Sequence, residues 1–308
     1  MLTYCLRRII TIIPVLLGIS LLTFMLGVFS PGNPAEFALD QNGIYTPTEA
    51  QIAAMSKELG TDKPFHIQYG AWLSQLLQGN LGKSYISGKE ITAEIKLRLP
   101  VTIKLSVLSL FFAGVGGIVM GLCASNRKNT LFNNLTHVML SIPSFWIAML
   151  LILCFCEILK IFPTGNEDGF KNYILPSLAC SFGTLATVAR FTRGAIIQEF
   201  GKQYFFTAKM RGLKKNRLLF HYALPNALIP IIALLGNYFA AILGGSVITE
   251  SIFSLPGIGI MAIEAIRYRD YPTLQAYVLI SGCSVVLVTT VVDIITSYLN
   301  PKINLGDP

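Results

Sequence analysis

The stretch Leu228 to Thr249, LIPIIALLGNYFAAILGGSVIT, decides the fold class, because it holds no charged residue over a length that suits a membrane crossing. A spanning helix needs about 20 mostly apolar residues to cross roughly 30 Å of hydrocarbon. Buried β-strands also read as apolar runs, but they usually end after about 4 to 8 residues. The stretch therefore predicts a transmembrane helix rather than a strand of a soluble core.

The composition of the whole chain supports this interpretation. Of its 308 residues, 53% are hydrophobic and 13% are charged, and the mean hydropathy is +0.60. These values lie outside the usual balance of a soluble domain. Five further windows are nearly free of charge: 9–29, 101–124, 135–159, 173–189 and 276–299. We therefore expect an all-α membrane protein with six transmembrane helices.

The orientation follows from the loops, because cytoplasmic loops carry an excess of Lys and Arg. Basic residues precede the first window at Arg7 and Arg8, and they gather again at 127–128 and 190–217. The opposite loops are mixed in sign: 30–100, 160–172 and 250–275. Both termini are expected to be cytoplasmic. The net charge of +8 then reflects topology, and no nucleic-acid partner is expected.

The first window and the long exterior loop have features of their own. The window 9–29 is too long for a typical signal-peptide core and no small-x-small cleavage site follows it, so we expect it to be retained. In the exterior loop, Trp72, Leu73, Leu76 and Leu77 suggest an amphipathic helix against the membrane or the pore mouth.

Chemical motifs are sparse. The six Cys and three His show no chelating spacing, so no metal site and no disulfide framework is expected. The segment GNLGKSY, 79–85, looks like the end of a phosphate-binding loop, but Leu77 stands where that loop requires Gly. Gly117 and Gly121 have the spacing that lets helices approach closely, a common and weak pattern. No polar cluster inside a span suggests a membrane-embedded enzyme, so no catalytic residue is assigned.

The most basic stretch is YFFTAKMRGLKKNRLLFHYALPNALIP, Tyr204 to Pro230. Phe206 and Met210 lie four apart, which predicts a short amphipathic helix that ends at Gly212. A second helical segment is expected from about residue 216 until Pro225. Such a helix–glycine–helix knob suits docking into a groove on a partner protein. The alternative is a solvated basic loop that only fixes the topology.

This spacing resembles the EAA signature of permease subunits in ATP-binding-cassette (ABC) importers: Glu-Ala-Ala, three residues, Gly, nine residues, an apolar residue, one residue, Leu-Pro. The matching positions here are Phe206, Thr207, Ala208, Gly212, Tyr222, Leu224 and Pro225. The first two depart from the signature. TAKMRGL followed by ALPNALIP is nevertheless similar to the form found in the dipeptide, oligopeptide and nickel branch.

The resemblance extends along nearly the whole chain. LRRIITIIPVLLGISLLTF resembles the branch's first helix, and the segment 59–85 is similar to its exterior part. ILPSLACSFGTLATVARFTRGAIIQEF resembles the helix before the coupling loop. ITESIFSLPGIGIMAIEAIRYRDYP, 248–272, resembles the last exterior loop, and VDIITSYLNPKI resembles the carboxyl end.

The resemblance implies the type I ABC importer permease architecture in the inner membrane, with the chain forming half of a path for short peptides or for nickel or metal chelates. It implies three kinds of partner besides the lipid: a second homologous permease, two ATP-binding subunits and an exterior solute-binding protein. ATP would be bound by the partner subunits, and no cofactor is expected in this chain. The implied division is 1–29 (first helix), 30–100 (exterior), 101–299 (five-helix core with the cytoplasmic coupling loop 196–227) and 300–308 (cytoplasmic tail).

Two sets of site residues follow. Those implied for ATPase coupling are Phe206, Thr207, Ala208, Met210, Gly212, Tyr222, Leu224 and Pro225. Candidates for lining the path are Asn237, Ser246 and Thr249, all placed on the fifth span, with ordinary helix packing as the alternative.

An ion-coupled secondary transporter is the alternative function. It would usually show acidic or His residues at mid-membrane and internal repeats. Here no internal repeat is visible. Five charged residues fall near the expected span ends: Lys104, Glu157, Arg190, Glu250 and Asp293. Asp293 is expected to pair with Arg190 or Arg193, or else to meet interfacial water.

Overall fold

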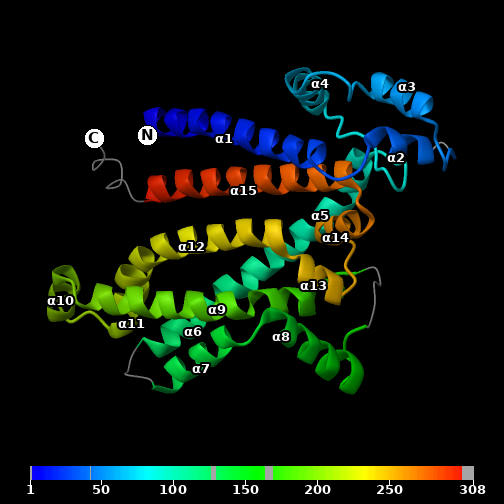
Figure 1. Ribbon diagram of the computed structural model, residues 1–308. Helices are drawn as coiled ribbons and strands as arrows, with labels where there is room; N and C mark the ends of the chain where they lie inside the picture. The colour runs from blue at the N-terminus through cyan, green and yellow to red at the C-terminus, as the bar shows by residue number, and fades with distance from the viewer. Residues whose placement is uncertain (1, 42, 126–129, 164–168, 300–308) are drawn as a thin grey trace. The chain divides into compact units, whose positions relative to one another are not determined.

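The computed structural model describes residues 2–41, 43–125, 130–163 and 169–299. These residues form helices and no β-strand, apart from an isolated bridge between Lys83 and Glu90, which confirms the all-α prediction (Figure 1). The helices are α1 (Leu2–Val28), α2 (Pro34–Gln41), α3 (Glu49–Leu59), α4 (Phe65–Leu77), α5 (Ile91–Phe111), η1 (Phe112–Gly116), α6 (Gly117–Ala124), α7 (Thr130–Ser141), α8 (Ser144–Leu151), η2 (Ile152–Ile158), α9 (Lys171–Phe200), α10 (Gln203–Met210), α11 (Lys215–Leu218), η3 (Leu219–Ala223), α12 (Leu224–Gly245), α13 (Val247–Ile252), α14 (Ile258–Tyr268) and α15 (Tyr271–Leu299), where η marks a π-helix.

The chain divides into two compact units, and the divisions fall inside α1, α5 and α15. Unit 1 comprises residues 1–9, 102–255 and 285–308, and it holds α6 to α13. Unit 2 comprises residues 10–101 and 256–284, and it holds α2 to α4 together with α14. The exterior segment 30–100 thus shares a unit with part of the last exterior loop.

Five helices in the described residues are long and apolar enough to cross a membrane: Ile10–Val28, Ile91–Ala124, Lys171–Phe200, Asn216–Gly244 and Tyr271–Leu299. A sixth span is present if the bent pair Leu131–Ser141 and Ser144–Ile158 counts as one. The expected number of spans is therefore reached only with this pair included.

The window 135–159 is wrong as one straight helix, because the chain bends by 94° between α7 and α8. The break contains Pro143, which has no N–H to donate and which disfavours the helical conformation of Ile142 before it. Hydropathy alone sees an uninterrupted apolar run there.

Several predicted ends also need correction. α9 continues to Phe200, so Arg190 and Arg193 lie on a helix that extends past its apolar window, and the expected coupling loop 196–227 begins within this helix. α12 ends at Gly245, so Ser246 lies at the N-cap position of the next helix and Thr249 lies on α13, outside the fifth span. An apolar window reports the part of a helix inside hydrocarbon, whereas the helix itself continues as long as its backbone hydrogen bonds do.

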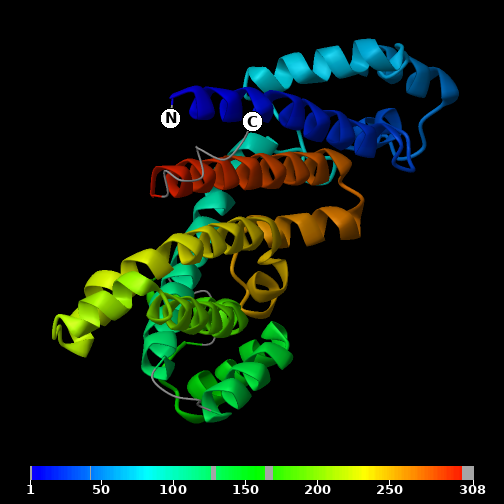
Figure 2. The same cartoon turned by 90° about the vertical axis from the view of Figure 1, so that its left-hand side faces the viewer.

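In unit 1, α6 packs directly against α9. A Cβ placed on Gly117 would lie 2.6 Å from the Cβ of Val188, and one on Gly121 would lie 2.6 Å from the carbonyl oxygen of Ala189. The small-residue spacing therefore does bring two helices into backbone contact, as the sequence suggested. Figure 2 looks almost along α9, with α12 on one side of it and α7 and α8 on the other.

The partner of Asp293 in unit 1 differs from the one expected. The carboxylate of Asp293 contacts the guanidinium of Arg8 at the start of α1, and not Arg190 or Arg193. Arg193 instead contacts α6 and α7, where it donates to the carbonyl of Ala124 (3.2 Å). The contact between Arg8 and Asp293 places the start of α1 and the end of α15 on the same side of the membrane.

In unit 2, the amphipathic helix of the exterior segment is α4, which lies against α1. The ring of Phe24 lies 5.3 Å from Phe65 and 5.5 Å from both Tyr69 and Trp72, measured between ring centres. The hydroxyl groups of Ser20 and Tyr69 are 2.8 Å apart. Aromatic packing and this hydrogen bond hold the exterior segment on α1.

Candidate functional site

The cytoplasmic stretch forms a helical hairpin in unit 1. α10 ends at Met210, Gly212 adopts a left-handed conformation with φ of 76°, and the chain turns helical again at Lys215. This confirms the predicted helix–glycine–helix arrangement. Figure 1 shows α10 beyond the ends of α9 and α12. We call residues 203–225 the hairpin.

One side of the hairpin is anchored on the bundle by apolar contacts. Ala208 and Leu218 are buried. The ring of Phe205 lies 4.7 Å from that of Phe200 at the end of α9. Phe205 and Phe200 pack on a buried cluster formed by Ile196, Ala223 and Ala227. These contacts join α10 to both α9 and α12.

Glu199 adds a polar anchor. Its buried carboxylate accepts hydrogen bonds from the hydroxyl of Tyr204 and from the Lys202 ammonium, the latter at 2.5 Å. Asn226 on α12 donates from its side-chain amide to the Tyr204 hydroxyl (3.2 Å) and to the carbonyl of Tyr222 (2.9 Å). Burial, followed by the hydrogen bond to Glu199, raises the pKa of Tyr204.

Sequence reasoning missed both Glu199 and Tyr204. A signal was available, because Glu199 is the single acidic residue between positions 190 and 217. An isolated carboxylate in a basic stretch has a high chance of being paired, and here it fixes the hairpin to the end of α9.

The other side of the hairpin is exposed. The side chains of Phe206 and Met210 are 62% and 74% exposed, four residues apart on α10. Thr207 is exposed, and its hydroxyl donates to the carbonyl of Gln203 (3.1 Å). Gly212 faces open space. Large exposed apolar side chains that lie together mark a surface for a partner.

The remaining matched residues lie where the hairpin joins α12. Ala208 is buried, Tyr222 is 36% exposed, Leu224 is half-buried and Pro225 is exposed. Basic side chains surround the apolar pair and are also exposed: Lys209, Arg211, Lys214 and Arg217. The hairpin therefore presents an apolar centre with a basic rim.

The three path candidates fall in different surroundings. Asn237 is exposed on α12. Ser246 and Thr249 are buried: the Ser246 hydroxyl donates to Glu250 (2.7 Å) and the Cys180 thiol donates to the Thr249 hydroxyl (3.1 Å). For these two residues the observed contacts are those of helix packing.

The sequence placed Glu250 at the start of an exterior loop. In the structure Glu250 lies on α13 and is fully buried. The hydroxyls of Thr102 on α5 and Ser246 both donate to its Oε1 at 2.7 Å. A buried charge costs free energy unless hydrogen bonds stabilise it. The carboxylate therefore ties α13 to α5 within unit 1.

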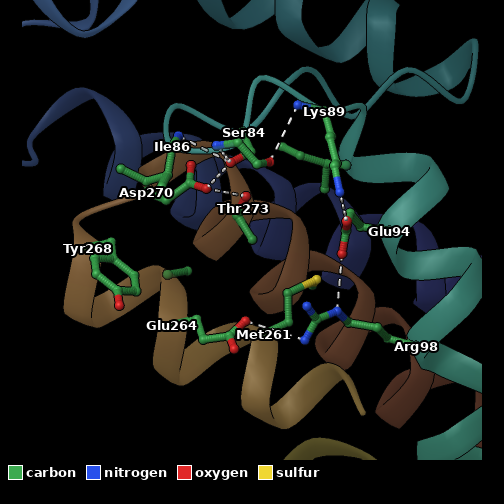
Figure 3. Close-up of a pocket in the computed structure, with 13 residues that line it drawn as sticks. Ser84, Ile86, Lys89, Glu94, Arg98, Met261, Glu264, Tyr268, Asp270 and Thr273 are labelled. Atoms are coloured by element: carbon green, nitrogen blue, oxygen red, sulfur yellow. Dashed lines mark hydrogen bonds and ion pairs between the residues drawn. The ribbon is translucent and has the colours of Figure 1, made fainter. Parts of the chain in front are cut away.

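Unit 2 holds a cavity of about 270 Å³ between the exterior segment and α14. Figure 3 shows the Arg98 guanidinium between two carboxylates, 3.1 Å from Glu94 and 3.4 Å from Glu264. Lys89 lies 3.9 Å from Glu94. Because these charges pair with one another, we interpret the cavity as a structural clamp on the exterior segment.

Asp270 closes the other end of this cavity. Its carboxylate accepts from the Ser84 hydroxyl (2.5 Å), the Tyr85 backbone N–H (3.0 Å) and the Thr273 hydroxyl (2.8 Å). Burial and the nearby charge of Asp270 raise the pKa of Tyr85 to about 12. Among the described residues, no three His, Cys, Asp or Glu side chains are grouped so that they could hold a metal ion.

Comparisons with known proteins agree along the chain. Residues 113–305 match the family described as binding-protein-dependent transport system inner membrane component, and residues 1–106 match its N-terminal family. The glutathione transport system permease protein GsiC of Salmonella typhimurium is 32% identical over 308 residues, covering 98% of this chain and 99% of the relative. The dipeptide transport system permease protein DppB of Alkalihalophilus pseudofirmus is also 32% identical, with the same two coverages.

A solved structure shares the fold. It is described as the crystal structure of an amino acid ABC transporter with histidines, and it matches with a TM-score of 0.53 at 17% identity. The match covers 67% of this chain and 94% of that chain.

Proposed function

The chain belongs to the family of binding-protein-dependent transport system inner membrane components, and from this premise we propose that its hairpin is the element that docks into an ATPase. The chain is a permease subunit of an ABC importer, a non-catalytic multi-pass protein of the inner membrane. It works with ATPase subunits and a solute-binding protein. The secondary-transporter alternative is not supported.

The observation that carries the docking proposal is the two-sided hairpin. Phe206 and Met210 are exposed, while the opposite side is fixed to the bundle. Aromatic and Met side chains fill a partner's groove well and supply much of an interface's binding energy. The basic rim contributes to the rate of encounter more than to affinity.

The anchoring gives the hairpin its mechanical role. Phe205 contacts Phe200, and Tyr204 contacts Glu199 and Asn226, so α10 moves together with the ends of α9 and α12. Both of those helices continue across the membrane. A displacement of the hairpin by an ATPase that closes on ATP would be transmitted into the membrane. ATP itself is proposed to be bound by the partner subunits.

The test compares variants of the exposed face with a rim variant. Phe206→Asp puts a charge into the apolar centre, and Gly212→Val forces a β-branched residue to positive φ at about 1 kcal/mol or more. Both variants should remain in the membrane but lose ATPase co-purification and uptake, whereas Lys214→Ala should stay close to wild type. Full ATPase association of Phe206→Asp would favour the alternative, a basic loop that only fixes topology.

The proposed assembly places a second homologous permease beside this chain, so that each of the two hairpins takes one ATPase and the two permeases enclose the path. A mass measurement of the purified complex checks it. One copy of this chain with a different permease and two ATPases is the expected stoichiometry. A complex that holds a single permease chain would contradict it.

The proposed cargo is a short peptide. Two relatives of about equal similarity are named for glutathione and for dipeptides, and both of these compounds are peptides. Uptake of labelled dipeptide, labelled glutathione and labelled nickel by a deletion strain, with and without this chain, decides the matter. Peptide uptake that depends on the chain is expected, and uptake of nickel alone would overturn the assignment.

A further inference from the structure

One narrow face of α9 consists of polar residues and glycine and is bordered by Phe191, although the helix crosses the membrane. The residues of this face follow one another at intervals of three or four, which places them on one side of a helix: Gly183, Thr187, Arg190, Gly194 and Gln198. A Cβ on Gly183 or Gly194 would meet no atom within 4 Å. We call these five residues the polar face.

The polar face is turned away from the interior of unit 1. Val188, Thr192 and Ile196, on the other side of α9, have no exposed surface. Arg190, Gly194 and Gln198 are exposed. Since lipid tails offer no hydrogen bonds, a polar face on a spanning helix is expected to line a water-filled path or a protein contact.

An open hollow lies in front of the polar face. Its volume is about 620 Å³, and it lies between α7, α9 and α12. Thr187, Arg190 and Gln198 supply polar groups, while Leu140, Phe191 and Pro230 supply apolar wall. Sites for small molecules typically measure about 300 to 1,000 Å³ and combine an apolar lining with a few polar groups.

Arg190 has no hydrogen bond or ion pair with any residue in the described part of the chain. Arg193, on the next turn, differs, because it donates to Ala124 and to the Asn133 side chain (3.0 Å). Glu199 is committed to Lys202 and Tyr204. Arg190 therefore presents an uncompensated positive charge to the hollow.

The depth of the polar groups distinguishes a path from a lipid site. At about 1.5 Å per residue, Arg190 lies roughly 15 Å from the end of α9 at Phe200, and Thr187 lies deeper still. On α12, Asn237 is exposed two turns beyond Pro230 on the same helix face. Polar groups thus continue from Arg190, at the cytoplasmic end of the apolar window 173–189, to Thr187 and Asn237, which lie inside the apolar windows and deeper than a lipid headgroup.

We propose that the polar face of α9 lines the translocation path and that Arg190 binds the carboxylate of the peptide that passes through it. This inference rests on the proposed function of the chain. A guanidinium matches a carboxylate with two parallel hydrogen bonds. Thr187, Gln198 and Asn237 can serve the peptide's amide groups, and the apolar wall accommodates its side chains. Because the hollow is open, the peptide is held weakly enough to leave.

The experiment uses the complete transporter in proteoliposomes, with dialanine as the probe. Arg190→Gln removes the charge and keeps a polar side chain. Arg190→Lys keeps the positive charge but lacks the paired N–H groups of the guanidinium that match a carboxylate. Lys57→Gln on α3 is the matched control, since it removes an exposed charge far from the hollow in sequence. Loss of a charge-assisted hydrogen bond of about 1.5 kcal/mol or more predicts at least about a tenfold loss of dialanine uptake for Arg190→Gln. Arg190→Lys should recover part of it.

A second measurement does not depend on the solute-binding protein. Cysteine at Gly194, in a background without the native cysteines, is modified with an anionic and a cationic thiol reagent of similar size. The anionic reagent should react faster, and Arg190→Gln should lower the ratio of the two rates by about tenfold, which corresponds to roughly 1.4 kcal/mol of electrostatic attraction. Dialanine in excess should slow modification only when Arg190 is present.

Several outcomes would overturn the inference. Dialanine uptake by Arg190→Gln within about twofold of wild type would show that the charge has no role in the path. Loss of the second permease on purification of Arg190→Gln would make Arg190 an interface residue. Dependence of the reagent ratio on the fraction of anionic lipid would make the hollow a headgroup site. If the wild-type transporter takes up no short peptide while the reagent ratio still depends on Arg190, the proposed cargo fails and the anion-attracting path stands.

Discussion

The hydroxyl of Tyr204 on α10 donates a hydrogen bond to the buried carboxylate of Glu199 near the end of α9. Tyr204 is thereby held over α12 as well, since Asn226 donates to the same hydroxyl (3.2 Å). One phenol thus joins the three helices that meet at the cytoplasmic end of unit 1. We infer that force applied to the hairpin is transmitted to the membrane through this contact.

Glu199→Ala should loosen the hairpin without unfolding the permease. The change removes the carboxylate that accepts from the Tyr204 hydroxyl and the Lys202 ammonium, and because both donors are partly exposed the loss is about 0.5 to 1.5 kcal/mol. Backbone amides of α10 should therefore exchange with deuterium faster, by roughly twofold to tenfold. Glu58→Ala on α3, which removes an exposed carboxylate, is the control. Unchanged exchange across residues 203–210 would show that Glu199 does not hold the hairpin.

The titration of Tyr204 gives a pH test of the same contact. Burial first, and then the bond to Glu199, raises the pKa of Tyr204 above its ordinary value of 10.0. The stabilisation is fully present below pH 10.0, and it is lost as the pH rises through the higher pKa of the folded state. Glu199→Gln should lower that pKa, although burial keeps it above the ordinary value. The absorbance of tyrosinate, measured as the difference from a Tyr204→Phe protein, reports the pKa of Tyr204. The same pKa in the wild-type protein and in Glu199→Gln would exclude the contact.

The contact of α6 with α9 should tolerate no side chain at its centre. A Cβ on Gly121 would lie 2.6 Å from the Ala189 carbonyl oxygen and 2.7 Å from the Thr192 Cβ. Gly121→Val must separate the helices, which typically costs about 1 to 3 kcal/mol. We expect a clear drop in the thermal unfolding temperature in detergent. Gly18→Val, where a Cβ meets nothing within 4 Å, should change it little. Equal stability of the two variants would contradict the packing.

The pair Arg8–Asp293 should couple weakly. Both side chains are partly exposed, at 44% and 32%, so solvent screens the interaction to about 0 to 1 kcal/mol. A double-mutant cycle with Arg8→Gln and Asp293→Asn should give a small favourable coupling energy, measured by unfolding in detergent. The same cycle with Arg190→Gln should be additive. Coupling of Asp293 to Arg190 in place of Arg8 would restore the pairing that the sequence suggested.

The sequence predicts the membrane fold well, because long apolar windows have few alternatives. It fails where polar chemistry changes the local path. Pro143 bends the third span, a break that no hydropathy average registers. α9 extends past Ala189 because its backbone hydrogen bonds continue to Phe200, so its length exceeds its apolar window.

The hairpin could be read from Phe206, Met210 and Gly212 because spacing and turn chemistry are local properties. Its anchoring could not, since Glu199 and Asn226 are far apart in sequence and meet only through Tyr204. Likewise Ser246 looked suited to the path, but its hydroxyl is taken by Glu250, a partner that becomes visible only once α13 is seen to leave the fifth span.

The docking of the hairpin is tested most directly by cross-linking from Met210, which is 74% exposed on α10. The assembled transporter carries a single cysteine at this position and one cysteine in the facing groove of the ATPase. We predict a disulfide between the two subunits whose yield changes when ATP is bound. The control places the cysteine at Leu77, which is 82% exposed in the exterior segment and should give no cross-link. Absence of any ATPase cross-link from Met210, in a transporter that still takes up peptide, would contradict the account.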